Sequence, residues 1–379
     1  MKIPQMNTRH WIHGLPLFAL MTTIFLCLSP HTNAQVSSDE AALGNGLALV
    51  DWAIIVAYAT GTIALGYYFS RKQSSTKEYF VGSGNMPWFL IGVSLFATLL
   101  STISYLSIPG EIVGKGPIYG VTLLAYPLVF IVVGYFMIPA YMNHRVTSAY
   151  ELLEVKLGLS VRMLGVGMFL LLRLVWMSLL VFLTAKAMAV MMGVGDDYVP
   201  DTQPLFSFDP KTRLTVVGTV VSVAIWYICT SGGDQVSVQR FMSTRDAKSA
   251  RKALATQLCV GAFITCVLYI VGFALMGYFV STPDLLPAGF DIKSNADDLF
   301  PRFISFHLPI GISGLVVSAM FAAAMSSIDS GVNSITAVVM TDLMDRFGKK
   351  PKTERGHVFT ARIFAFAIGA IVVIGSSFV

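Results

Sequence analysis

The chain has 379 residues, of which 55% are hydrophobic and 12% charged, with a net charge of +5 and a mean hydropathy of +0.70. A soluble domain carries about 25% charged residues, so this composition excludes a water-soluble globular protein. Several charge-free apolar runs are long enough to cross about 30 Å of hydrocarbon as helices. The composition predicts an all-α, polytopic protein of the cell (plasma or inner) membrane, and the modest charge argues against nucleic acid as a partner.

Residues 1–34 have the pattern of a secretory signal peptide. The first ten positions include Lys2 and Arg9, a short apolar stretch follows, and Ala34 ends a cleavage site of small residues. This succession is typical of a signal peptide, with an uncleaved first helix as the alternative. We therefore expect residues 35–379 to form one transmembrane domain whose mature N-terminus lies outside the cell.

Eight apolar stretches are predicted to span the bilayer as helices, because irregular backbone in lipid would leave its amides unpaired. They are residues 49–69, 86–108, 119–142, 163–192, 214–231, 253–280, 308–340 and 363–379. Alternate connections between them hold seventeen lysines and arginines, whereas the other connections hold five. Basic connections face the cytoplasm, so this bias agrees with an N-terminus outside the cell.

The residue types that most often carry catalysis are scattered. The four cysteines lie in apolar segments without metal-ligand spacing, which is typical of small buried hydrophobic residues. The six histidines are dispersed as well. The sequence shows no nucleophile constellation, metal-ligand set or cofactor loop, and we expect a protein that is not an enzyme.

A first polar segment lies inside the span at residues 86–108. Five hydroxyls fall within seven residues, at Ser101, Thr102, Ser104, Tyr105 and Ser107. One interpretation is that they bond back to carbonyls of the preceding turn or allow close helix packing. The other is a broken helix whose freed carbonyls and hydroxyls bind an ion and a solute at the midplane.

A second polar segment lies inside the span at residues 308–340, where an ionisable residue, Asp329, indicates a functional site. One face of this helix carries Ser326, Ser327, Ser330, Asn333 and Ser334. Hydroxyl oxygens suit a hard cation better than a transition metal. The alternative is a face of small residues that packs against another helix, with Asp329 near water.

A third polar segment follows the span at residues 214–231. Gly232 and Gly233 permit local unwinding of a membrane helix, and Asp234 beside them needs water, a cation or Arg240. The alternative is an ordinary helix end at the membrane surface.

These three segments together resemble the sodium:solute symporter family. Gly-Gly-Asp-Gln-Val-Ser-Val-Gln-Arg-Phe at residues 232–241 is similar to the family's sixth core helix, residues 322–334 to its eighth, and residues 94–109 to its first. The resemblance covers most of the chain after residue 45, in the family's order. It implies the LeuT-type inverted-repeat fold, in which two five-helix halves hold solute and ion between discontinuous first and sixth helices.

The resemblance also implies sodium as the coupling ion. The sodium ligands would be the carbonyls of Ala97, Leu100 and Ala323 and the hydroxyls of Ser326 and Ser327. A second sodium position would lie at Asp329 and Ser330, which some members complete with an aspartate from the fifth core helix. Because they lie on the two helices expected to break, the residues expected to border the substrate cavity are Ser101, Ser104, Tyr105, Tyr227 and Thr230.

The chain departs from the family between the spans at residues 163–192 and 214–231. The family has two more helices there, whereas only residues 193–213 intervene here, with an apparent junction at residues 198–203. The chain also stops inside its last apolar run, without a tenth core helix, which indicates truncation. We therefore expect an incomplete fold that binds sodium weakly and does not complete a transport cycle.

The function expected for the intact protein is secondary active transport, by sodium-coupled symport of a small organic solute through alternating access. Ile103 and Ser104 stand where sugar-transporting members tend to carry an acid–amide pair, so a sugar fits badly. Sialic acid, monocarboxylates and amino acids remain open. The alternatives are a membrane sensor domain of a longer signalling protein and an inactive or structural fragment of a transporter.

Overall fold

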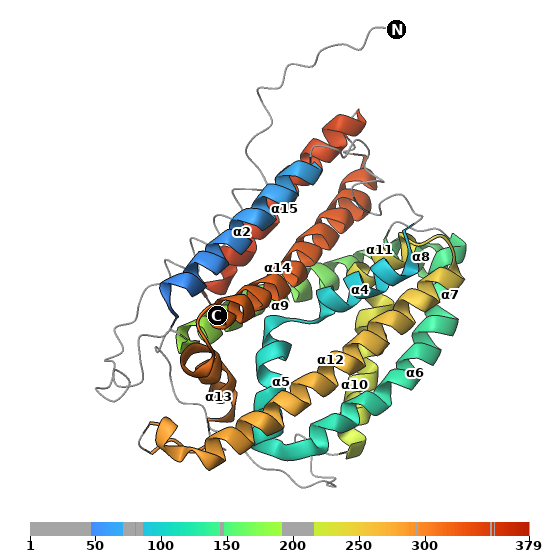
Figure 1. The fold of residues 1–379 in the computed structure, drawn as a ribbon. Coiled ribbons are helices and arrows are strands. Elements are labelled where there is room, and N and C mark those ends of the chain that lie inside the picture. The colour runs from blue at the N-terminus through green and yellow to red at the C-terminus, as the bar shows by residue number, and fades with distance from the viewer. Residues whose placement is uncertain are drawn as a thin grey trace.

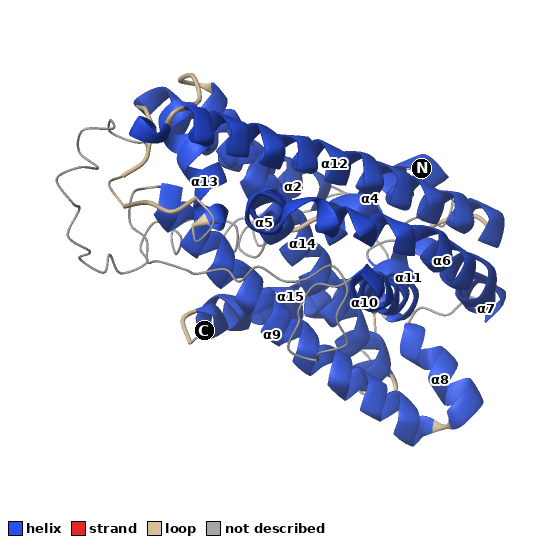
Figure 2. Ribbon diagram, turned by 90° about the horizontal axis from the view of Figure 1, so that it is seen from below, coloured by secondary structure: helices blue, strands red, loops and turns tan. Residues whose placement is uncertain are grey.

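The structure is a computed structural model that describes residues 47–70, 80, 86–144, 148–191, 216–287, 289–292, 295–348, 351 and 353–378. The predicted signal peptide and the predicted junction at residues 198–203 lie outside these ranges. Within them the regular structure is helical throughout, without a strand (Figures 1 and 2). This confirms the all-α fold class.

The described helices fall into two groups along the chain. The first half holds α2 (Leu49–Ser70), α4 (Trp88–Leu99), α5 (Thr102–Lys115), η2 (Gly116–Ala125), α6 (Tyr126–Ile131), η3 (Val132–Met137), α7 (Ile138–His144), α8 (Ala149–Leu157) and α9 (Leu159–Met191). The second half holds α10 (Val216–Ile228), η4 (Cys229–Gly233), α11 (Gln235–Met242), α12 (Ala247–Ser281), η5 (Pro283–Leu285), α13 (Ala296–Arg302), η6 (Phe303–His307), α14 (Ile312–Val338), η7 (Val339–Asp345) and α15 (Glu354–Ser376).

The described helices match seven of the eight predicted spans. Six are single long apolar runs, and the seventh is the pair α4–α5, which bends by 69° at a short break. Figure 1 shows α5 turning sharply away from α4. The eighth prediction, residues 214–231, corresponds to a shorter apolar helix whose described part covers Val217–Gly233. It ends where the backbone becomes extended at Asp234.

Helix α14 lies at the centre of the described fold. It packs against α2, α4, α5, α9, α11 and α15. Apolar clusters fill the contacts of α14 with α5, α12 and α13 on one side and with α9 and α15 on the other. Large apolar side chains on the outer faces of α2, α9 and α12 are exposed, as expected of helices that face lipid.

A buried carboxylate fixes the start of α14. Asp51 of α2 is 2% exposed, and its Oδ1 accepts hydrogen bonds from the backbone N–H of Gly311 at 2.8 Å and of Gly314 at 2.7 Å. A carboxylate at a helix N-terminus satisfies the unpaired N–H groups and the positive end of the helix dipole. Asp51 therefore ties α2 to the helix that carries the serine pair at residues 326–327.

Candidate functional site

Two broken helices frame the candidate site. Between α4 and α5 the backbone becomes extended at Leu100 (φ −77°, ψ 107°), and the Ser101 hydroxyl caps α5 by accepting a hydrogen bond from the Ser104 N–H at 3.2 Å. Between η4 and α11 the backbone is extended at Asp234 (φ −76°, ψ 132°), whose carboxylate accepts from the Val236 N–H at 2.9 Å. Both breaks expected from the sequence are present.

The break after α4 lies against the serine pair of α14. Ser327 is 5% exposed, and its Oγ donates a hydrogen bond of 2.8 Å to the Thr98 carbonyl and lies 3.5 Å from the Leu100 carbonyl. The last carbonyls of a helix have no further turn to bond them. Hydroxyl and carbonyl oxygens therefore converge here from two helices, as a sodium ligand set requires.

The other expected sodium ligands lie on the same two helices. Ala97 is in the last turn of α4, and Ala323 and the half-buried Ser326 lie within the unbroken α14. The Ala323 carbonyl is engaged in the helix and offers only its second lone pair. The Ser327 hydroxyl donates to the Thr98 carbonyl, and sequence reasoning missed this oxygen.

A cavity of about 120 Å³ lies beside the break after α4. Apolar residues form most of its wall, and they include Leu100. The polar residues in the wall come from five elements: Ser104 of α5, Thr122 of η2, Tyr126 of α6, Tyr227 of α10, and Gln257 and Thr265 of α12. The two tyrosine hydroxyls lie 3.3 Å apart.

Of the five residues expected to border the substrate cavity, Ser104 and Tyr227 are in its wall. Ser101 caps α5 and lies 3.2 Å from the Ser104 hydroxyl. Tyr105 packs against the Phe300 ring of α13, with ring centroids 5.6 Å apart. The Thr230 hydroxyl donates to the Trp226 carbonyl one turn earlier.

Gln257 is the wall residue with an unused polar atom. It is 3% exposed, its Nε2 lies 3.4 Å from the Ser231 hydroxyl, and its Oε1 is buried without a hydrogen-bond partner among the described residues. A buried acceptor without a donor is costly. A donor group on a bound solute would satisfy it.

The polar residues of α11 bind neighbouring helices rather than the cavity. Asp234 forms a 3.2 Å ion pair with Arg173 of α9, Gln235 accepts from the Ala149 N–H of α8 at 2.8 Å, and Gln239 accepts from the Ser334 hydroxyl of α14 at 3.1 Å. The Asp-Gln-x-x-x-Gln-Arg element therefore holds α11 against three helices.

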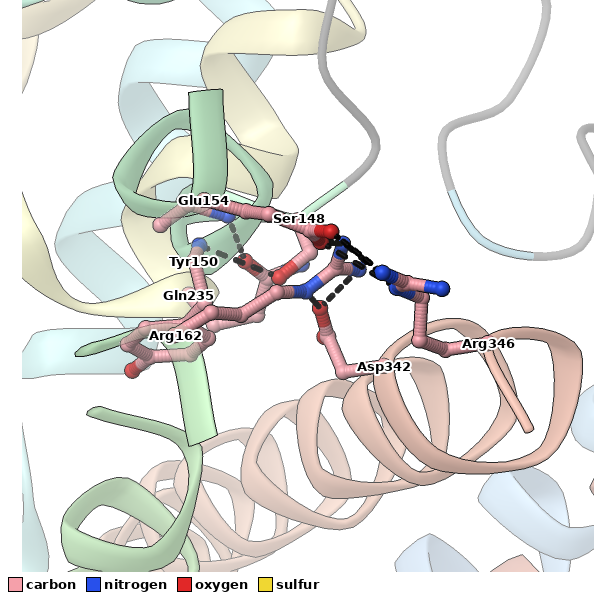
Figure 3. Close-up of polar contacts among 8 residues, drawn as sticks. Ser148, Tyr150, Glu154, Arg162, Gln235, Asp342 and Arg346 are labelled. Atoms are coloured by element: carbon pink, nitrogen blue, oxygen red, sulfur yellow. Dashed lines mark hydrogen bonds and ion pairs between the residues drawn. The ribbon is translucent and has the colours of Figure 1, made fainter. Parts of the chain in front are cut away.

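Figure 3 shows an ion-pair group where α8, the start of α9 and η7 meet. Arg162 Nε donates to Asp342 at 2.8 Å and its guanidinium also pairs with Glu154, while Arg346 donates to Glu154 at 2.6 Å. Hydrogen bonds from Arg346 and Arg162 hold the pKa of Glu154 below its ordinary value. Sequence analysis counted the two arginines only as topological charges and missed this group.

Comparison with known proteins places the chain in a family of membrane transporters. The sequence model of the sodium:solute symporter family matches residues 183–377, which is more than half of the chain. The chain belongs to the sodium:solute symporter family. Family members are sodium-coupled symporters of small organic solutes, which confirms sodium as the coupling ion and a multi-pass membrane protein.

Individual relatives agree with this assignment. The chain is 27% identical over 390 residues to the sodium/sialic acid symporter SiaT of Proteus mirabilis, covering 84% of this chain and 76% of the relative. It is 22% identical over 350 residues to the sodium-coupled monocarboxylate transporter 1 of Xenopus laevis, covering 75% of this chain and 56% of the relative.

A solved structure of a Na⁺-coupled sialic acid symporter in a substrate-bound, outward-open state has the same fold. Its TM-score is 0.76 at 24% identity, covering 87% of this chain and 82% of that chain. This likeness confirms the LeuT-type fold.

The Proteus alignment also contains positions that this chain lacks. Because 84% of 379 residues is about 318 residues, about 72 of the 390 aligned positions have no counterpart here.

Proposed function

We propose that the break after α4 and the serine pair of α14 form the sodium site of this chain, and that the adjacent cavity is its solute site. The observation that carries the proposal is the double position of Leu100. Leu100 forms part of the cavity wall, and its carbonyl oxygen lies 3.5 Å from the Ser327 hydroxyl. One residue at a helix break thus serves both sites.

The chemistry of the proposed sodium site follows from its oxygen atoms. Sodium is a hard cation that prefers neutral and anionic oxygen ligands. The Ser327 hydroxyl donates its proton to the Thr98 carbonyl, which leaves its lone pairs available to an ion. Sodium would join α4 to α14, and its loss would release the break that borders the solute, which couples the two events.

For the solute we propose a small organic carboxylate that also carries a hydroxyl or N–H group. Carboxylates are the stated cargo of the sialic acid and monocarboxylate relatives. The N-terminus of α5 begins beside the cavity, and a helix N-terminus attracts an anion. The buried Gln257 Oε1, which has no partner among the described residues, would accept a hydrogen bond from such a group on the solute.

Solute binding in the presence and absence of sodium tests this proposal without requiring a transport cycle. The purified chain in nanodiscs is titrated with sialic acid, lactate and a neutral cyclitol, in sodium and in potassium at equal ionic strength. We expect a hydroxylated carboxylate to bind at least about tenfold more tightly in sodium, which corresponds to about 1.4 kcal/mol. Equal affinity in both salts, or preference for the cyclitol, would contradict the proposal.

We also propose that the chain lacks two helices that cover α14 in its relatives. About 72 aligned positions of the Proteus relative are absent, and the predicted junction at residues 198–203 falls at the place expected for them. On α14, the exposed Asp329 and the half-exposed Ser326 and Asn333 lie on one face at helical spacing. A polar face in a membrane helix is costly unless another helix or water covers it.

We also propose an orientation in the membrane and a limit on transport by this chain. The excess of basic residues in alternate connections supports a cytoplasmic location for the α8 end of the molecule and an N-terminus outside the cell. Because these two helices are absent, one of the two five-helix halves that move in alternating access would be incomplete. We therefore propose that the 379-residue chain binds sodium but does not complete a transport cycle.

A further inference from the structure

The guanidinium of Arg240 lies between two helices beside the proposed sodium site. Its Nη2 donates to the Ser330 hydroxyl of α14 at 2.6 Å, and its Nε donates to the Ser94 hydroxyl of α4 at 3.1 Å. Its Nη1 donates to the Val236 carbonyl of its own helix at 3.1 Å. Three directional hydrogen bonds therefore fix this cation in one place.

Ser330, expected from the sequence to bind a second sodium ion, is engaged by this cation. Thr98 donates its hydroxyl proton to the Ser94 carbonyl at 2.9 Å, so in the 3.0 Å contact between Thr98 and Ser330 the donor is Ser330. A serine hydroxyl has one proton and two lone pairs. The proton binds Thr98, one lone pair binds Arg240, and the remaining lone pair lies next to a positive charge.

A carboxylate on α14 carries the charge opposite to that of Arg240. Asp329 precedes Ser330 on α14 and interacts electrostatically with the Arg240 guanidinium. The other guanidinium nearby belongs to Arg173, which pairs with Asp234 at 3.2 Å. One cation and one anion are thus already present at this position, and a sodium ion would add an unbalanced charge within a membrane-spanning helix.

We propose that Arg240 is a built-in cation that occupies the second ion position, so that Ser330 accepts a hydrogen bond from the guanidinium, Asp329 balances its charge, and this chain binds one sodium ion. This inference rests on the proposed function only in taking the one bound ion to be the sodium at the break after α4. It replaces the expectation from the sequence that Asp329 and Ser330 bind a second sodium ion.

Counting bound sodium tests the proposal independently of transport. Equilibrium binding of radioactive sodium to the purified full chain gives the number of sites. Removing the cation in Arg240→Gln frees Asp329 and Ser330, so we expect this variant to bind one sodium ion more than the unsubstituted chain. Adding Asp329→Asn should remove the extra site. The same number of sites in Arg240→Gln and the unsubstituted chain would overturn the proposal.

A milder variant covers the case in which Arg240→Gln does not fold. Asp329 is exposed, and Asp329→Asn alone should leave the number of sodium sites unchanged. Loss of one site in that variant would overturn the proposal. Arg251→Gln is the matched control for charge removal, because its guanidinium stacks on the Tyr135 ring at 4.9 Å and should not change the count.

The two proposals fail in different ways. If the unsubstituted chain binds no sodium, or keeps its site in the double variant Ser326→Ala and Ser327→Ala, the sodium site at the α4 break is wrong. The assignment of Arg240 is decided by the difference in count between Arg240→Gln and the unsubstituted chain, and a count of two sites in the unsubstituted chain would overturn it as well.

Discussion

The Ser327 hydroxyl of α14 donates a hydrogen bond of 2.8 Å to the carbonyl of Thr98 in the last turn of α4. The two residues are far apart in the sequence and belong to helices of opposite halves of the fold. The contact exists because α4 ends at Leu99 and leaves carbonyls without intrahelical donors. A small hydroxyl on the facing helix can reach them, and the sodium site that we propose rests on this geometry.

Replacing both Ser326 and Ser327 with alanine should weaken sodium binding. Two of five expected oxygen ligands are lost, and each lost polar partner costs about 1–3 kcal/mol, so we expect affinity to fall at least about tenfold. Sodium-dependent thermal stabilisation of the purified chain measures the change. The control is Ser318→Ala, whose hydroxyl bonds to the Gly314 carbonyl within α14. Unchanged sodium dependence in the double variant would rule out these two ligands.

Solute should protect cysteines placed in the cavity wall. In a background without native cysteines, Ser104→Cys and Tyr227→Cys should react more slowly with a water-soluble thiol reagent when sodium and solute are present, because both positions line the cavity. Thr230→Cys is the matched control on the Tyr227 helix segment, because the Thr230 hydroxyl bonds back to Trp226. Protection of Thr230→Cys together with reactivity of Tyr227→Cys would place the solute elsewhere.

Glu154 should make stability depend on acid pH. Arg346 and Arg162 hold the pKa of Glu154 below its ordinary value of 4.5. A carboxylate with a lowered folded-state pKa stabilises the fold above its unfolded pKa, and this contribution disappears as pH falls through the folded-state value. We expect Glu154→Gln to lower the apparent melting temperature at pH 7 and to differ less from the unsubstituted chain as pH falls below 4.5.

The control for this pH dependence is Asp284→Asn, which alters an exposed carboxylate of η5. Its melting temperature should follow that of the unsubstituted chain at every pH. A Glu154→Gln difference that stays constant from pH 7 to below 4.5 would show that the side chain contributes by packing alone.

Restoring two helices should restore transport. The two-helix segment of the Proteus relative, inserted between Pro200 and Asp201, should cover the polar face of α14 and give sodium-driven solute uptake in proteoliposomes. The matched control is a flexible Gly/Ser segment of equal length, which should give none. Concentrative uptake by the 379-residue chain itself would refute the proposed deletion.

The amino-acid sequence by itself determined the class of molecule and the position of its helix breaks. Apolar run length sets which segments span the membrane, and Gly232-Gly233-Asp234 and the hydroxyls after Leu100 set where two helices stop. These are short-range effects, since hydropathy and helix capping depend on neighbouring residues. For that reason seven of the eight predicted spans and both breaks agree with the structure.

Only the tertiary structure decided which polar side chains share a site. From similar sequence surroundings, the Ser104 side chain faces the cavity, Ser101 caps a helix and Tyr105 packs on Phe300. Gln257 lines the same cavity from α12, and Arg240 forms hydrogen bonds with Ser94 and Ser330 on two other helices. Such partners depend on how helices distant in the sequence cross and on which rotamers their packing allows, and neither is encoded in any local pattern.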